Sequence, residues 1–258
     1  NNLFISTAKY GLELGFIDAL GVDTKTITNA WHRNLKELYN LGDAKEKPQG
    51  KKLISSENGG KMNLSPSISP NGKYLIFLSE KNVFTTDLYL ADAQKGDIIR
   101  KASSNASNGD LDYINVMESA GSWSPDSENF IYVGVKNGDN VIVMADVSKG
   151  KTLETIKIPG VPAFANPVFS PDGKDIYVSG LVNGQVDIYK YTLKSKKTEQ
   201  ITFDIYSENM ISFSPDGMTM AFCYDKRSVD EGRKNGRYTF DIALMNVDSR
   251  QIRVLDVF

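Results

Sequence analysis

The sequence predicts a mainly β protein with a β-propeller fold, and three observations support this prediction. A Ser-Pro-Asp-Gly phrase or a close variant of it occurs four times along the 258 residues. The serines of successive copies lie 55, 46 and 44 residues apart, close to the length of one four-stranded propeller blade, about 40 to 50 residues. A short apolar run follows each copy. We therefore expect about four four-stranded blades, in a ring that is complete or incomplete.

Each phrase is expected to form the turn of a hairpin. Pro presets φ for the first central position of the turn, Asp or Asn accepts hydrogen bonds from nearby backbone donors, and Gly takes the left-handed conformation. The second copy has Ser127 in place of Gly, so we expect a positive φ there at a cost of about 1 kcal/mol. The turn residues are Ser69, Pro70, Asn71 and Gly72; Ser124, Pro125 and Asp126; Ser170, Pro171, Asp172 and Gly173; and Ser214, Pro215, Asp216 and Gly217.

The strands after the turns are predicted to be buried on both faces. The runs 74–78 and 131–135 are apolar at consecutive positions, which indicates a sheet covered from both sides. A third strand in each repeat begins near an acidic or amide residue, namely Asp87, Asn140, Asp187 and Asp241. Since one blade cannot cover its own faces, only stacked repeats remove them from water.

The first part of the chain has a helical period instead. Apolar residues in 24–39 follow i, i+3, i+4 spacing, with Asp23 or Thr24 as the N-cap and Gly42 as the stop. A shorter helix is expected to end near Gly21. We thus expect a helical segment over 1–42, a polar linker over 43–52 and propeller blades over 53–258. The stretch 51–56 reads as an outer strand that would close the ring by joining the last blade.

The repeat phrase resembles a known family. The pattern S-P-D-G-K, then an apolar strand, then D-[ILV]-Y, resembles the TolB-like, or PD40, variety of WD40-like propeller repeats over about residues 64–258. The resemblance implies a periplasmic or secreted protein of the cell envelope that binds a partner on the propeller face, as TolB proteins bind a peptidoglycan-associated lipoprotein. TolB-like propellers usually have six or more blades, which favours a propeller that is cut short here.

A second resemblance concerns the helical segment. The stretch "GFIDALGVDTKTITNAWHRNLKELY" is similar to the C-terminal tail of gluzincin-type zinc peptidase domains. In such peptidases an H-E-x-x-H helix upstream holds the zinc, but this sequence contains no such motif and only one histidine, His32. The resemblance implies that a catalytic part, if there is one, lies before Asn1.

Several kinds of chemistry find no support in the residues. The net charge of -2 gives no basic surface for nucleic acid, and no apolar run is long enough to span a membrane. One His and one Cys cannot supply an ordinary zinc site, and the sequence has neither a G-x-S-x-G elbow nor a phosphate-binding glycine loop. We expect no cofactor and no catalysis by this chain alone. We also expect His32 to face solvent or cap a helix, and Cys223 to be a buried thiol.

Two loops are candidate sites. The stretch 226–238 lengthens the last repeat, and it could form a partner-binding finger, although a plain surface loop is favoured. Its candidate residues are Arg227, Arg233, Lys234, Arg237 and Tyr238. The loop 105–119 carries Asp110 and Asp112, which could bind Ca²⁺, although a solvated connector is favoured. Trp31 and Trp123 are expected to be core residues.

These observations leave two main hypotheses about function. The first is a non-catalytic propeller module that binds a protein or peptide, of unknown oligomeric state. The second is the propeller part of a larger secreted or periplasmic zinc peptidase. A weaker third option is the propeller of a prolyl-oligopeptidase-like hydrolase, which predicts a G-x-S-x-G domain downstream.

Overall fold

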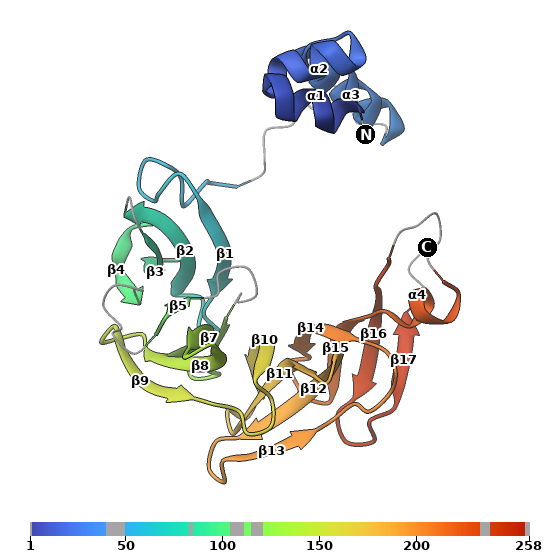
Figure 1. The fold of residues 1–258 in the computed structure, drawn as a ribbon. Coiled ribbons are helices and arrows are strands. Elements are labelled where there is room, and N and C mark those ends of the chain that lie inside the picture. The colour runs from blue at the N-terminus through green and yellow to red at the C-terminus, as the bar shows by residue number, and fades with distance from the viewer. Residues whose placement is uncertain are drawn as a thin grey trace. The chain divides into compact units, whose positions relative to one another are not determined.

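A computed structural model describes residues 2–39, 50–82, 85–103, 111–114, 121–232 and 238–255. The chain divides into two compact units, Asn1–Lys51 and Lys52–Phe258. The first unit is helical and the second carries the β-sheets (Figure 1). None of the helices among the described residues is both long and apolar enough to cross a membrane.

The helical unit contains α1 (Asn2–Tyr10), α2 (Leu12–Leu20) and α3 (Thr24–Leu38). The predicted end of α2 is confirmed, because Gly21 caps it with a left-handed φ of 73°. Asp23 is the N-cap of α3 and accepts a hydrogen bond from Thr26 N at 2.6 Å. The stop predicted at Gly42 lies outside the described residues, and α3 ends earlier, at Leu38.

The helix α1 was not among the predicted elements. It packs closely on α2 at Gly15, where an added Cβ would lie only 2.4 Å from Thr7 Cα. The prediction that Trp31 is a core residue is wrong, because its side chain is 59% exposed. No residue of α3 is buried in the structure, so Trp31 has no core to enter. His32 is exposed, as expected.

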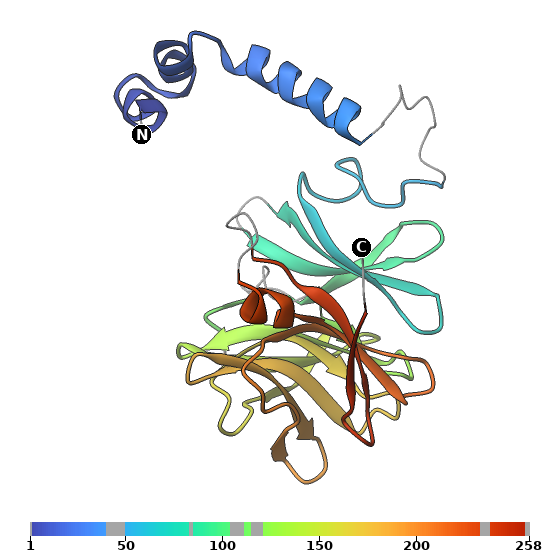
Figure 2. The same cartoon turned by 90° about the vertical axis from the view of Figure 1, so that its right-hand side faces the viewer.

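The described residues of the second unit form four antiparallel sheets, which confirms the predicted β-propeller blades. Within each sheet the strands follow chain order from the inner to the outer position, and the sheets follow one another around a common axis (Figures 1 and 2). Blade 1 consists of β1 (Asn63–Ile68), β2 (Tyr74–Asn82), β3 (Thr85–Asp92) and β4 (Ile98–Ser103). Blade 2 consists of β5 (Tyr113–Ile114), β6 (Ser122–Trp123), β7 (Asn129–Lys136), β8 (Asp139–Asp146) and β9 (Lys151–Ile156). Blade 3 consists of β10 (Ala163–Phe169), β11 (Asp175–Val182), β12 (Gln185–Thr192) and β13 (Lys197–Gln200). Blade 4 consists of β14 (Glu208–Phe213), β15 (Thr219–Tyr224), β16 (Asp241–Asn246) and β17 (Ile252–Leu255).

Blade 2 has a divided inner strand, since β5 and β6 both pair with β7. Tyr113 lies opposite Val135 and Trp123 lies opposite Phe130, so the two short strands follow one another along the same edge. The inner strands of the other three blades each contain a bulge. Ser65, Asn166 and Met210 take positive φ there, each four residues before the serine of its turn.

The cores lie between neighbouring blades. One buried cluster joins blades 1 and 2, a second joins blades 2 and 3, and a third joins blades 3 and 4. Trp123 is buried, as predicted, and its ring nitrogen donates to Ser67 O of blade 1 at 3.1 Å. Packing between neighbouring blades buries both faces of the strands that the sequence predicts to be apolar on both sides. Cys223 on β15 is only half-buried, which corrects the expectation of a buried thiol.

The prediction of an outer strand at 51–56 is wrong. Residues 51–56 form no strand, and Ile54 packs on the outward face of blade 1. The side chain of Asn58 holds this segment by donating to Leu53 O at 2.7 Å and to Gly96 O at 3.1 Å. Blade 4 takes its outer strand from β17, so it has no need of a strand from residues 51–56.

Candidate protein-binding surface

The four phrase-bearing turns share one hydrogen-bonding pattern. In each turn the serine hydroxyl donates to the Asp or Asn side chain and accepts from the backbone N–H five residues later. The side chain of the third residue also accepts from the N–H two residues later, as Asp172 does from Lys174 N at 3.1 Å. These bonds close every turn on itself, so its polar groups are used within the fold.

Successive turns also touch one another. A Cβ at Gly217 would lie 3.2 Å from Pro171 of the preceding turn, and one at Gly173 would lie 3.5 Å from Pro125. The predicted positive φ of Ser127 is confirmed at 64°. Its hydroxyl accepts a hydrogen bond from Asn71 N at 3.1 Å, a contact between blades that glycine could not make. At this end of the blades, the Ser-Pro-Asp-Gly phrase thus closes each turn and places it against the turn of the next blade.

The opposite end of the blades carries the acidic and amide residues at the start of the third strands. Asp87 is fully buried, forms an ion pair with Lys101 at 2.7 Å and accepts hydrogen bonds from Asn82 and Thr85. Asn140 of blade 2 donates to Phe164 O of blade 3 at 2.6 Å. These side chains therefore hold hairpins and neighbouring blades together.

The candidate loop of blade 4 lies at this end and contains a short helix, α4 (Lys226–Asp230) (Figure 1). Of the predicted binding residues, Arg233, Lys234 and Arg237 lie outside the described residues. Arg227 forms an ion pair with Asp241 at 3.2 Å, so it secures α4 to β16. Tyr238 donates its hydroxyl proton to the buried Asp225 and leaves its ring 45% exposed.

A network that sequence reasoning missed holds α4 to the segment between blades 3 and 4. Lys226 Nζ donates to Tyr206 Oη and to Asp230 Oδ2, each at 2.7 Å, and lies 4.3 Å from the centre of the Tyr206 ring. Tyr206 in turn donates to Asp230 at 2.7 Å. The bond with Asp230, followed by that with Tyr206, raises the pKa of Lys226, and Lys226 lowers the pKa of Asp230. Lys226 is therefore charged and fixed.

The far side of the loop is fixed as well. Ser228 Oγ donates to Thr239 O at 2.8 Å, and Thr239 N donates back to Ser228 Oγ at 2.7 Å. Asp225 also accepts from Ser207 N at 2.7 Å. The described parts of 203–207, 225–232 and 238–240 thus form one hydrogen-bonded platform.

This platform presents apolar side chains to solvent. We call it the α4 surface and define it by Phe203, Ile205, Val229, Tyr238 and Phe240, which are 70%, 69%, 40%, 45% and 47% exposed. The rings of Tyr238 and Phe240 lie 5.5 Å apart at their centres. Exposed aromatic and aliphatic groups on a rigid base are typical of protein-binding surfaces.

A buried carboxyl group lies beneath this end of the blades. Glu208 on β14 is fully buried, and Thr202 Oγ1 donates to its Oε2 at 2.7 Å. Burial raises the pKa of Glu208 to about 8, and Asp204, Asp187 and Asp225 add to the effect because they are negatively charged. Glu208 therefore holds its proton at neutral pH.

The calcium prediction remains a prediction. Asp110 lies outside the described residues, and Asp112 accepts a hydrogen bond from Gly138 N at 3.2 Å. Within the described ranges, no three His, Cys, Asp or Glu side chains gather as metal ligands.

Comparison with known proteins supports the type of repeat. Residues 115–231 match the sequence family described as "TolB beta propeller domain" (PD40). The blade repeats are TolB-like. A curated relative, the Tol-Pal system protein TolB of Ruthia magnifica, is 30% identical over 51% of this chain and 32% of its own length. An uncharacterised protein of Agrobacterium fabrum is 30% identical over 53% of this chain and 45% of its own length.

Solved TolB structures show the same fold. The crystal structure of TolB from Acinetobacter baumannii aligns with 82% of this chain at a TM-score of 0.62 and 21% identity. A putative TolB from Agrobacterium tumefaciens aligns with 73% of the chain at a TM-score of 0.57 and 21% identity. The alignments cover 47% and 63% of those two proteins, so this chain spans only part of the relatives it matches. The comparisons do not show the predicted peptidase-tail resemblance.

Proposed function

We propose that this chain is a non-catalytic propeller module of the cell envelope, periplasmic or secreted, that binds a protein or peptide through the α4 surface. One observation supports this proposal above all: five exposed apolar side chains lie on a platform whose polar groups are already hydrogen-bonded or ion-paired. Such a base loses little conformational freedom on binding, which favours affinity. The TolB-like repeats support the proposal, since the TolB relative is named for the Tol-Pal system.

The proposal can be tested by capture from the envelope fraction of the source cell. The chain as bait should recover one partner in a fixed ratio, and a Phe203→Ser, Phe240→Ser double variant should lose it. Met218→Ser is the matched control, because Met218 is 64% exposed and lies in a turn at the other end of blade 4. Equal capture by the double variant would exclude the α4 surface as the binding site.

A second candidate is the propeller part of a larger zinc peptidase whose catalytic domain lies outside this sequence. The observation that favours it is the apolar exposure of the helical unit, where Phe4, Leu12 and Leu38 are 78%, 64% and 74% exposed. Such side chains fit a neighbour that covers them. An H-E-x-x-H motif encoded upstream of Asn1 would support this candidate, and its absence within about one domain length would end it.

A further inference from the structure

The outer strands of the four blades share one equivalent position. In each blade it lies opposite the residue that stands two places before the end of the third strand. We call it the rim position. The residues at the rim position of blades 1 to 4 are Arg100, Glu154, Glu199 and Arg253. The same site on the blade can therefore be compared in four settings.

The rim position is ion-paired where blade 2 meets blade 3 and where blade 3 meets blade 4. Glu154 lies 3.7 Å from Lys196 of blade 3, and Glu199 forms an ion pair with Arg250 of blade 4. Lys196 and Arg250 occupy the same place in their blades, because each has a positive φ and donates its N–H to the carbonyl four residues earlier. An acid on one blade thus meets a base in the turn of the next.

The contact between blades 1 and 2 is built differently. Its rim position is Arg100, and the place of Lys196 and Arg250 is taken by Gly150, which has a positive φ of 64° and makes the same backbone hydrogen bond. A Cβ at Gly150 would lie 3.2 Å from Arg100 Cδ. Both members of the ion pair are therefore replaced, the acid by an arginine and the base by a residue without a side chain.

Arg100 consequently has more donors than acceptors. Its Nη1 donates to Ser148 O of blade 2, which is the one acceptor for this side chain among the described residues. Its Nε is buried and has no hydrogen-bond partner there. A guanidinium has five N–H donors, and a buried donor of a charged group without an acceptor costs free energy. The site thus favours an anionic acceptor that the described residues do not supply.

A hollow of about 410 Å³ contains Arg100 in its lining and lies between blades 1 and 2. This volume is at the small end of the range for small-molecule sites, about 300 to 1,000 Å³. The apolar part of its lining comes from both blades and consists of Tyr74, Leu90, Ile99 and Val147. A cation among apolar side chains suits an acid that carries a short apolar group.

The edge of the hollow favours a singly charged anion. Asp126 and Glu128 also line it and are exposed. The carboxylate of Asp126 accepts from Ser124 Oγ at 2.5 Å and from Glu128 N at 2.9 Å, and these bonds lower the pKa of Asp126. Its negative charge repels a doubly charged phosphate more than a carboxylate.

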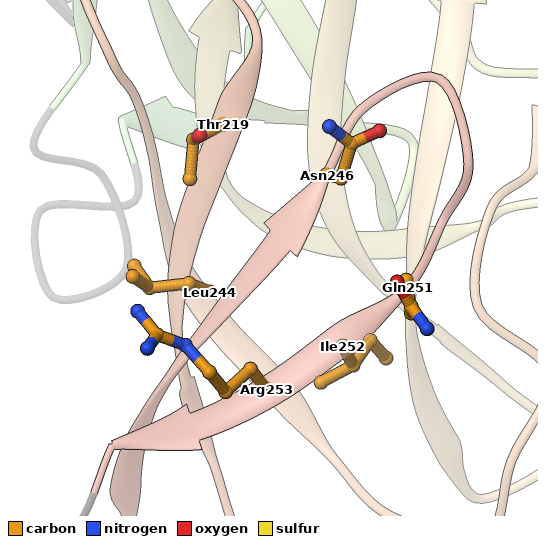
Figure 3. A pocket seen from close by; sticks show the side chains of 6 residues that line it. All are labelled: Thr219, Leu244, Asn246, Gln251, Ile252 and Arg253. Carbon is orange, nitrogen blue, oxygen red and sulfur yellow. The ribbon is translucent and has the colours of Figure 1, made fainter.

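Blade 4 repeats one wall of this hollow. Its rim residue Arg253 lies opposite Leu244 as Arg100 lies opposite Leu90. Arg253 and Leu244 line a second hollow of about 490 Å³ (Figure 3). The described residues around this second hollow all belong to blade 4. A ligand is therefore held from one side at Arg253, but from two sides at Arg100.

We propose that the hollow between blades 1 and 2 binds a carboxylate on a short apolar group, with Arg100 as the cation that pairs with it. The ligand supplies the acid that the other two contacts between blades already contain. Two sources offer such a group, a free organic acid and the C-terminal residue of a peptide. The site lies at the end of the blades that carries the Ser-Pro-Asp-Gly turns, and it does not depend on the partner proposed for the α4 surface.

The test is an NMR titration of the 258-residue chain with isocaproate, with acetyl-glycyl-leucine and with the neutral isocaproamide. We expect both acids to shift the amide signals of Ser127 and Ser148, and the neutral amide to leave them in place. Stronger binding of acetyl-glycyl-leucine assigns the site to peptide C-termini, and stronger binding of isocaproate assigns it to free acids. Arg100→Ala should weaken binding of either acid about tenfold or more. Arg253→Ala is the matched control and should leave binding unchanged.

A second variant, Arg100→Glu with Gly150→Lys, rebuilds the ion pair that the other two contacts contain. Lysine fits this place in blade 3, where Lys196 has a φ of 55°. We expect the double variant to keep the melting temperature of the unaltered chain and to lose binding of both acids. The proposal is overturned if neither acid shifts the two signals at millimolar concentration, or if isocaproamide binds as well as isocaproate. Undiminished binding by Arg100→Ala or by the double variant would overturn it too.

Discussion

Glu208 links the stability of the propeller to pH, and the size of the effect follows from its burial. The folded state raises the pKa of this carboxyl group from 4.5 to about 8. Below the unfolded value both states hold the proton, and the full stability is present. As pH rises toward 8 the unfolded state loses the proton first, so stability falls by about 1.4 kcal/mol per pH unit from this group alone.

Replacing Glu208 with Gln should remove this loss, since the amide has no proton to lose and keeps a similar shape. We expect the variant to gain stability relative to the natural chain as pH rises, by roughly 3 kcal/mol between about pH 5 and about pH 7. Urea unfolding followed by tryptophan fluorescence over this range measures the difference.

The control is Glu199→Gln. Glu199 is a partly exposed residue on β13, and its carboxylate pairs with Lys190 at 2.6 Å. Lys190, followed by Arg250, lowers the pKa of Glu199, so its contribution is lost as pH falls and has the opposite sign. If the advantage of Glu208→Gln were the same at both ends of the pH range, the reasoning about Glu208 would be refuted.

Three further predictions concern contacts described above, each checked by chemical denaturation. Ser127→Ala keeps the positive φ and loses the hydrogen bond from Asn71, so it should lower the free energy of unfolding by about 1 kcal/mol. Ser127→Gly should change it by no more than about 0.5 kcal/mol, because the relief of backbone strain offsets the loss of the bond. Ile142→Ala should cost about 2 to 5 kcal/mol, since the side chain is fully buried; a cost below about 1 kcal/mol would contradict the packing. Arg227→Ala should cost about 1 to 3 kcal/mol, because it leaves the largely buried Asp241 without its partner. An unchanged midpoint would show that the pair contributes nothing.

The repeat phrase made the blades predictable because it encodes a local event. A turn that closes within six residues, as Ser69 to Tyr74 does, needs nothing from the rest of the chain. The spacing of the turns then fixes the length of each blade. The N-cap at Asp23 and the stop at Gly21 were predictable for the same reason.

The α4 surface was not predictable because its parts are far apart in the sequence. Tyr206 and Asp230 meet only after blades 3 and 4 have packed, and a lone Tyr before a strand carries no signal of that meeting. Periodicity also misled in two places. Trp31 has the spacing of a core residue but no layer to cover it, and 51–56 has the composition of a strand but is held as a loop by Asn58.

The contact between successive turns bears on how such a chain can grow. In blades 3 and 4 the glycine of the turn fits against the proline of the turn before it, as Gly173 does against Pro125 and Gly217 against Pro171. A duplicated blade of this kind therefore carries both the proline and the glycine that the contact between successive turns uses. The number of blades in a ring can therefore change without a new kind of contact between turns.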